Sequence, residues 1–195
     1  MKTTFLLQFL LAISFTSSAQ QGTLDKEAFL SYTELWNYLK TANTVSPNSS
    51  IASPFDTIEY DKVIAYDFDG RHEKHTVILK NGQFVSTVIK QQFLTQAQTD
   101  QILNALTKKS SYGGQTAACF EPLFAIVFFK SNKMVNQINV CLDCNYLESS
   151  IEIPAQLKNT IKIEKEVYPM IGFSKKGAKA IKRLCKEIDF LYGSY

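Results

Sequence analysis

The sequence lacks the short motifs that mark the common catalytic classes. It contains no glycine-rich phosphate-binding loop, no serine nucleophile elbow and no His-Glu-x-x-His motif. Histidine occurs only twice in 195 residues, as His72 and His75, so few imidazoles are available for metal binding or acid–base chemistry. The sequence therefore predicts no catalytic residue, no metal site and no cofactor.

Long apolar runs are absent after the first 20 residues. A helix that spans a bilayer needs roughly 20 apolar residues, so no membrane span is predicted. The mostly apolar segment 5–15 follows a single charge at Lys2 and precedes the small residues 16–19. This order is typical of a cleavable signal peptide. We therefore expect residues 1–19 to be removed and the protein to be periplasmic or secreted.

A strong excess of charge of one sign is also absent. The formal net charge is +3, and removal of Lys2 with the signal peptide lowers it to +2. Lysines and carboxylates are interspersed, so no nucleic-acid partner is predicted. The lysine-rich segment 175–186 alternates charged and apolar residues at helical spacing, which favours a solvated helix face over a binding patch.

The hydrophobic pattern predicts one α+β domain over residues 20–195, a length that favours a single core. Apolar residues spaced by three and four predict an N-terminal helix over 24–42. Asn81-Gly82 is a strong hairpin signal between two expected strands. The expected strands are 62–68, 75–80, 83–89, 123–129, 134–142 and 147–153.

Two more helices are expected, each opened by a capping residue. Thr95 and Gln98 have the spacing of a capping box, and Ser174 begins the last amphipathic stretch. The order β-β-β-α then occurs twice, which suggests an internal duplication, although coincidence also accounts for so thin an identity. We expect one antiparallel sheet of about six strands with both helices on one face.

Three of the four cysteines converge at one end of a hairpin. If the chain turns near Asn132, Cys119 falls opposite Cys144 and Cys141 lies nearby. In an oxidising compartment a disulfide is the default for cysteines that can meet, so the sequence favours a Cys119–Cys144 bridge, with Cys141–Cys144 as the competing pair. Cys185 lies on the apolar stripe of the last helix and is expected to be buried and unreactive.

This segment resembles an uncharacterised group of bacterial exported proteins. The likeness rests on Cys119-aromatic-x-Pro122 before an apolar strand, on Cys141-x-x-Cys144 after the next strand, and on a late helix opened by serine. In that group the proline is followed by a basic residue and then by a polar or histidine residue. In this chain Pro122 is followed by Leu123 and Phe124. The resemblance implies a fold and a compartment, and no activity.

Two further interpretations of Cys119, Cys141 and Cys144 compete with a structural disulfide. A zinc site normally needs four ligands, and His72 and His75 would point to opposite faces of a strand. A redox Cys-x-x-Cys normally opens a helix, whereas a strand is expected after Cys144. The sequence therefore favours a non-enzymatic binding or structural module with a protein or small-molecule ligand, and a thiol-redox or metal-binding protein is the alternative.

Overall fold

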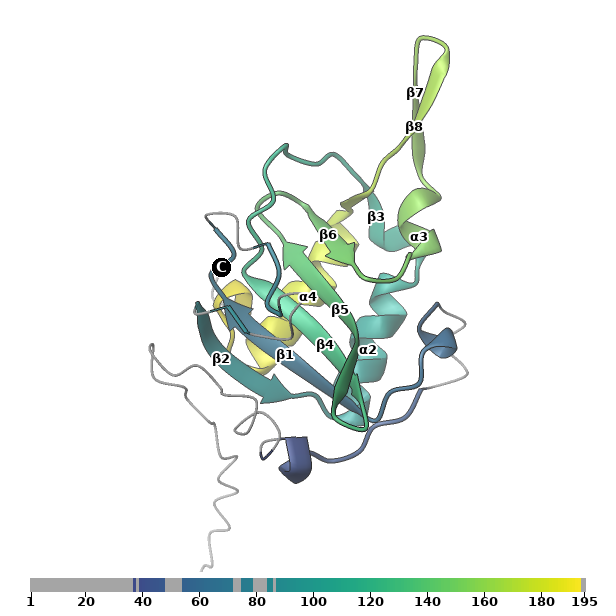
Figure 1. Ribbon diagram of the computed structural model, residues 1–195. Helices are drawn as coiled ribbons and strands as arrows, with labels where there is room; N and C mark the ends of the chain where they lie inside the picture. Colours follow the sequence, from purple (N-terminus) through teal and green to yellow (C-terminus); the bar gives the residue numbers. More distant parts are fainter. Residues whose placement is uncertain are drawn as a thin grey trace, which may run out of the picture.

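The computed structural model describes residues 37, 39–47, 54–71, 75–78, 84–85 and 87–193. Five antiparallel strands form its central sheet, in the order β2-β1-β4-β5-β6 (Figure 1). The strands are β1 (Lys62–Phe68), β2 (Val88–Phe93), β4 (Phe124–Lys130), β5 (Lys133–Cys141) and β6 (Tyr146–Ser149). The predicted signal peptide lies outside the described residues and stays a prediction.

The β4–β5 hairpin has the register expected from the sequence. Phe124 pairs with Val140 and Ile126 with Ile138. The connecting residues Ser131 and Asn132 both have positive φ, 48° and 63°, as a two-residue type I′ turn requires. This register places the residue before β4 beside the end of β5, where the cysteines lie.

The two long helices are α2 (Gln96–Leu106) and α4 (Lys175–Glu187), and both predicted caps are confirmed. The Gln98 backbone N–H donates to the Thr95 hydroxyl at 3.3 Å, and the Thr95 N–H donates to the Gln98 side chain at 3.0 Å. The Gly177 N–H donates to the Ser174 hydroxyl at 3.2 Å. These bonds satisfy donors that the first turn of a helix leaves unpaired.

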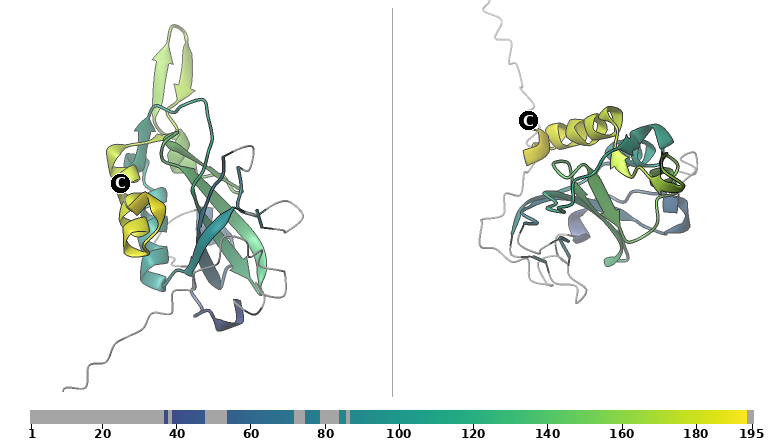
Figure 2. Two further views of the ribbon diagram at one scale, coloured as in Figure 1. Left: turned by 90° about the vertical axis from the view of Figure 1, so that its left-hand side faces the viewer. Right: turned by 90° about the horizontal axis from the view of Figure 1, so that it is seen from above.

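Both helices pack on the same face of the sheet, as predicted (Figure 2). Ile102 and Ile181 are buried against Ala65 and Ile126 of the central strands. Further core residues on this face include Leu103, Leu106, Phe128, Ile138, Val140 and Leu184. Burial of such side chains contributes roughly 25 cal/mol for each Å² of apolar surface removed from water, so this face holds the main core.

The opposite face of β1 and β4 is covered by Leu39 and by residues 77–78 and 84–85. The predicted Asn81-Gly82 turn lies outside the described residues. On either side of it Ile78 and Phe84 form an isolated antiparallel bridge, and the strand expected from residue 83 is replaced by β2, which begins at Val88. The side chains of Gln137 and Asn139 on β5 accept the backbone N–H groups of Ile78 and Val77, both at 3.3 Å. These bonds hold the segment across the sheet face instead of at the sheet edge.

The expectation of about six strands in one sheet is not confirmed, since the central sheet of the described residues has five. The first of the two expected β-β-β-α units contributes β1 and β2 to the sheet, and the second contributes β4, β5 and β6. The two units therefore differ in strand number, and the internal duplication stays a hypothesis. Of the predicted N-terminal helix, residues 37 and 39–41 are helical and the rest lies outside the described residues.

The stretch between β6 and α4 contains elements that the sequence pattern did not predict. A short helix, α3 (Pro154–Leu157), precedes a hairpin of β7 (Thr160–Ile163) and β8 (Glu166–Pro169) that projects from the domain (Figure 1). β9 (Gly172–Phe173) pairs with β3 (Tyr112–Gly114). The remaining elements are the 3₁₀ turns η1 (Pro54–Thr57), η2 (Lys109–Ser111) and η3 (Leu191–Gly193). None of the helices in the described part of the chain is long and apolar enough to cross a bilayer.

Candidate functional site

Three cysteines meet at the end of the β4–β5 hairpin. Cys141 is the last residue of β5, and Cys144 lies in the turn before β6. These two form a disulfide, with Cα atoms 5.2 Å apart. Cys119 lies in the segment that leads into β4, and its free thiol Sγ is 3.4 Å from the Cys144 Sγ.

The predicted convergence of Cys119 and Cys144 is confirmed, whereas the predicted bond between them is wrong. The bond joins Cys144 to Cys141 instead. The cause is the tight reversal after β5: Cys141 pairs with Tyr146 across the turn, and Asn145 has a φ of 63°. Because Asn145 adopts the left-handed backbone conformation, the chain reverses direction within the turn. Cys144 therefore lies beside Cys141 at the end of β5.

Backbone hydrogen bonds hold the segment that carries Cys119. The Gly70 N–H donates to the Pro122 carbonyl at 2.8 Å, and the Ala117 N–H donates to the Cys144 carbonyl at 3.0 Å. A Cβ on Gly70 would overlap the Pro122 carbonyl oxygen. The close contact between residue 70 and Pro122 therefore requires glycine at position 70. The segment is therefore fixed on both sides of Cys119.

The three cysteine residues differ sharply in their exposure. Cys141 is 0% and Cys144 1% exposed, whereas Cys119 is exposed. Phe120 covers the disulfide and packs on Tyr146, with ring centroids 4.8 Å apart. The disulfide is thus shielded from solvent, and the free thiol beside it belongs to an exposed residue, Cys119.

Backbone amides donate hydrogen bonds to both sulfurs of the disulfide. The Cys144 N–H donates to the Cys141 Sγ at 3.0 Å, and the Glu121 N–H donates to the Cys144 Sγ at 3.3 Å. Such donors favour a sulfur that carries negative charge. If the disulfide is broken, the sulfur that becomes a thiolate therefore already accepts a hydrogen bond from a backbone N–H group.

Cys119 and Cys144 line a hollow of about 380 Å³. Its rim is charged, and Arg71 donates to Asp69 at 2.6 Å. The other charged lining residues are Glu121 and Asp143. Cys119 and Cys144 therefore border one open hollow, in which Arg71 is the only basic lining residue.

Cys185 lies apart from this cluster. It is fully buried on the inner face of α4, which confirms its predicted burial. Desolvation, together with the nearby charge of Asp67, raises the pKa of the Cys185 thiol to about 12. At neutral pH Cys185 is therefore a protonated, apolar core residue.

The metal alternative finds no support in the described part of the chain. No group of three or more His, Cys, Asp or Glu side chains is arranged there to hold a metal ion. His75 packs its ring against Phe120, with centroids 5.9 Å apart, and His72 lies outside the described residues. Two of the three clustered cysteines are bonded to each other, which removes their thiolates as ligands.

The sequence pattern did not identify several residues of this site. Gly70 and Arg71 come from the end of β1, and Asp143 comes from the turn after β5. In the sequence, the Asp69-Gly70 pair indicates only a turn. Its contact with Pro122 joins segments 52 residues apart, which a local pattern does not reveal.

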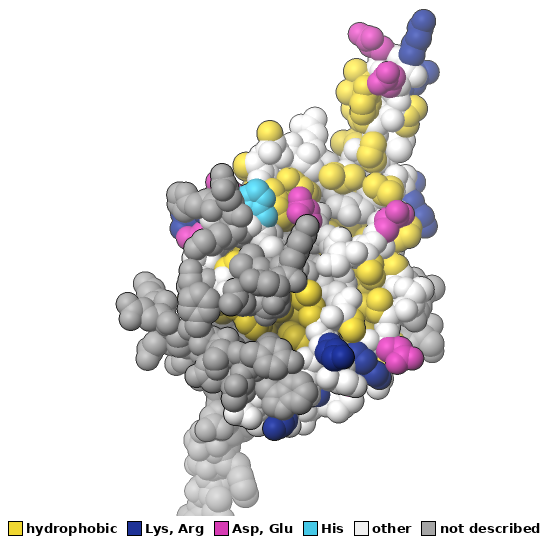
Figure 3. Space-filling view, viewed as in Figure 1, with side chains coloured by type: hydrophobic (Ala, Val, Ile, Leu, Met, Phe, Trp, Pro, Cys, Tyr) yellow, Lys and Arg dark blue, Asp and Glu magenta, His cyan; other side chains and the backbone are white. Residues whose placement is uncertain are grey.

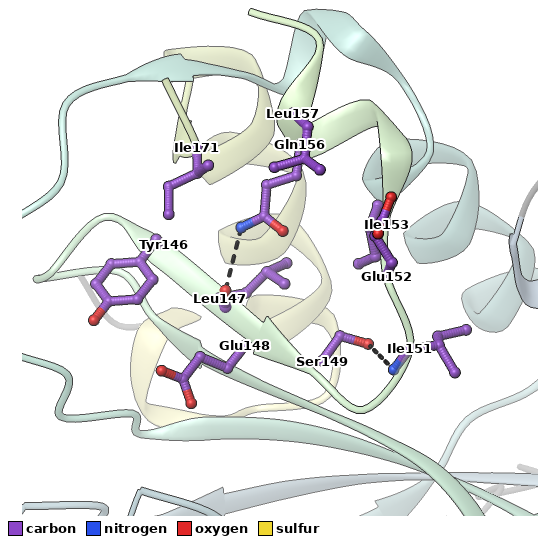
Figure 4. Close-up of a pocket in the computed structure, with 10 residues that line it drawn as sticks. All are labelled: Tyr146, Leu147, Glu148, Ser149, Ile151, Glu152, Ile153, Gln156, Leu157 and Ile171. Atoms are coloured by element: carbon purple, nitrogen blue, oxygen red, sulfur yellow. Dashed lines mark hydrogen bonds between the residues drawn. The ribbon is translucent and has the colours of Figure 1, made fainter. Parts of the chain in front are cut away.

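A second hollow, of about 410 Å³, lies between β6 and α3 (Figure 4). The Gln156 side chain crosses it and donates to the Leu147 carbonyl at 3.2 Å. Leu157 and Ile171 form an apolar wall, and Glu148 and Glu152 add two carboxylates. This hollow was not predicted from the sequence.

Comparisons with known proteins find no match. No protein-family model, no curated protein and no solved structure is significantly similar to the chain. The resemblance to bacterial exported proteins therefore stays a prediction, and the functional argument rests on the geometry of the site.

Proposed function

We propose that the protein carries out thiol–disulfide exchange, with Cys119 as the surface thiol through which the Cys141–Cys144 disulfide reacts. One observation carries this proposal: the free thiol of an exposed residue, Cys119, lies 3.4 Å from a sulfur of a disulfide that is itself buried. Cys144 borders the hollow but is only 1% exposed, and Cys141 is fully buried, so an external thiol has little direct access to either sulfur. The route from solvent to the disulfide therefore passes through Cys119.

The first step is an internal exchange. The Cys119 thiolate attacks the Cys144 Sγ, so a Cys119–Cys144 bond forms and the Cys144–Cys141 bond breaks. The electron pair leaves on the Cys141 sulfur, which already accepts the Cys144 N–H at 3.0 Å. Because Cys141 is fully buried, we expect its thiolate then to take up a proton.

The next two steps transfer the disulfide to a substrate dithiol. The first substrate thiolate attacks the Cys119 Sγ and releases Cys144 as a thiolate. The second substrate thiolate attacks the substrate sulfur of this mixed disulfide and releases Cys119. The substrate loses two electrons and two protons, and Cys141 and Cys144 end as thiols. An external disulfide restores the bridge by the same steps in reverse.

The proposed place of this chemistry is an oxidising compartment outside the cytoplasm. The signal-peptide pattern of residues 1–19 supports that location, and disulfides persist in such compartments. The sequence alone favoured a binding or structural module. The spacing of the three sulfur atoms favours the thiol-redox alternative.

The test is transfer of the disulfide to a synthetic peptide that contains two reduced cysteines. We expect the oxidised protein to oxidise this peptide, and Cys119→Ser to slow the transfer by at least about ten-fold, since thiol access sets the rate of exchange. Cys185→Ala is the matched control, because it removes the other free thiol and should keep the wild-type rate. Equal rates in Cys119→Ser and wild type, or no transfer by wild type, would contradict the proposal.

A further inference from the structure

The β7–β8 hairpin is unusually exposed for a segment rich in apolar residues. Every residue from 160 to 169 is exposed, and Ile163 and Val167 reach 54% and 62%. Figure 3 shows the hairpin extending beyond the body of the domain, with apolar side chains along it and charges at its tip. An isolated two-stranded hairpin has marginal stability, so this segment needs a partner surface to bury its apolar side chains.

One face of the hairpin concentrates its apolar residues. Ile161 pairs with Tyr168 and Ile163 with Glu166, so these four side chains share a face. The Tyr168 hydroxyl donates a hydrogen bond to the Glu166 carboxylate on the same face. This carboxylate therefore already has a partner inside the hairpin. Lys162 lies on the other face, and Glu164 and Lys165 form the turn, so the exposed ammonium groups of Lys162 and Lys165 can meet carboxylates of a partner beside the hairpin's own Glu164.

The hollow beside β6 has complementary properties. β6 is an edge strand of the sheet. The Leu147 carbonyl on its outer side accepts the Gln156 side-chain amide at 3.2 Å (Figure 4), so the amide lies where the N–H of an added strand would donate. The residues that line the hollow include Glu148 and Glu152 and no basic side chain.

The hollow lies at the base of the hairpin, because Leu157 and Ile171 flank β7 and β8 in the sequence, and this position suits a second copy of the chain as the partner. If two copies lie antiparallel about a two-fold axis, each hairpin tip reaches the base of the other. The lysines of one protomer then meet Glu148 and Glu152 of its partner. β7 is the strand suited to pairing, because it contains no proline and its outer edge is free, whereas β8 ends at Pro169.

We propose that the protein forms a two-fold dimer by arm exchange, in which β7 of each protomer adds to the outer edge of β6 of its partner. The backbone of β7 replaces the Gln156 amide at the Leu147 carbonyl. Ile161 and Ile163 cover the apolar wall formed by Leu157 and Ile171. The proposal is independent of the thiol chemistry.

Sedimentation equilibrium of the oxidised protein between about 1 and 200 µM tests this proposal. We expect a dimer whose dissociation constant rises at least ten-fold in Ile163→Lys. The paired variants Glu148→Lys with Glu152→Lys, and Lys162→Glu with Lys165→Glu, should each have the same effect. Combining the two pairs in one chain should restore most of the affinity, because the charges are then exchanged across the interface.

Lys179→Glu with Lys186→Glu is the matched control. Both lysines are exposed on α4, and the change in net charge is identical to that of the hairpin pair. This variant should dimerise like the wild type. A monomer at every concentration, or a dimer that none of the β6 and hairpin variants weakens, would overturn the proposal.

Discussion

Cys119 and Cys185 are the two cysteines outside the disulfide, and their surroundings are opposite. Cys119 is exposed beside a charged hollow, with the Cys144 Sγ 3.4 Å away. Cys185 is fully buried among the apolar residues of α4, and its pKa is raised to about 12. The comparison shows that exposure and neighbouring atoms place the same side chain in two chemically different environments within one small domain.

The largest expected difference between these thiols is in alkylation. At pH 8 a thiol with a pKa of about 12 has only about 1 part in 10⁴ as thiolate, and burial adds a steric barrier. We expect iodoacetamide to modify Cys119 in the folded protein at least about 1,000-fold faster than Cys185. Mass spectrometry of proteolytic peptides at timed intervals measures both rates.

Unfolding the protein in guanidinium chloride is the control for this measurement, because both thiols then ionise near the ordinary value for cysteine. Their rates should become equal within a few fold. Comparable rates in the folded protein would show that Cys185 is accessible and would remove the distinction between the two environments.

The second expected difference is in stability. Cys185→Ser places a hydroxyl in an apolar core and should lower the free energy of unfolding by about 2 kcal/mol. Cys119→Ser changes an exposed side chain and should alter it by less than about 0.5 kcal/mol. Urea unfolding followed by circular dichroism measures both, with Cys185→Ala as the control that removes the thiol without adding a polar atom. Similar losses for the two serine variants would contradict the assignment.

The smallest predicted effect concerns the support of Cys119. Gly70→Ala would force the Pro122 carbonyl away from residue 70, and the segment with Cys119 should move with it. We expect transfer of the disulfide to the dithiol peptide to slow about ten-fold, because exchange depends on the access and position of the attacking sulfur. Thr116→Ala, an exposed change in the same segment, is the control. An unchanged transfer rate in Gly70→Ala would show that this anchor does not position the thiol.

Local signals predicted much of the fold. Thr95 with Gln98 and Ser174 identified the starts of α2 and α4 because capping residues act within one turn of the chain. The turn at Asn132 fixed the register of β4 and β5, and with it the approach of Cys119 to Cys144. These features depend on residues close together in sequence.

The disulfide partner and the covering segment could not be predicted in this way. The Cys141–Cys144 bond depends on the positive φ of Asn145, which follows from the turn that the chain adopts between β5 and β6. Residues 77–78 are held by Gln137 and Asn139 from another strand. The alternation of Ile161 and Ile163 resembles a half-buried strand, although both residues are exposed.

The most direct measurement of the central claim is the site of the mixed disulfide between the protein and the dithiol peptide. The oxidised protein is mixed with the peptide, quenched in acid within seconds, digested and mapped by mass spectrometry without reduction. The account predicts that the peptide is attached through Cys119, together with a population of the Cys119–Cys144 isomer in which Cys141 is free. Attachment through Cys144 or Cys141, with Cys119 remaining an unmodified thiol, would contradict it.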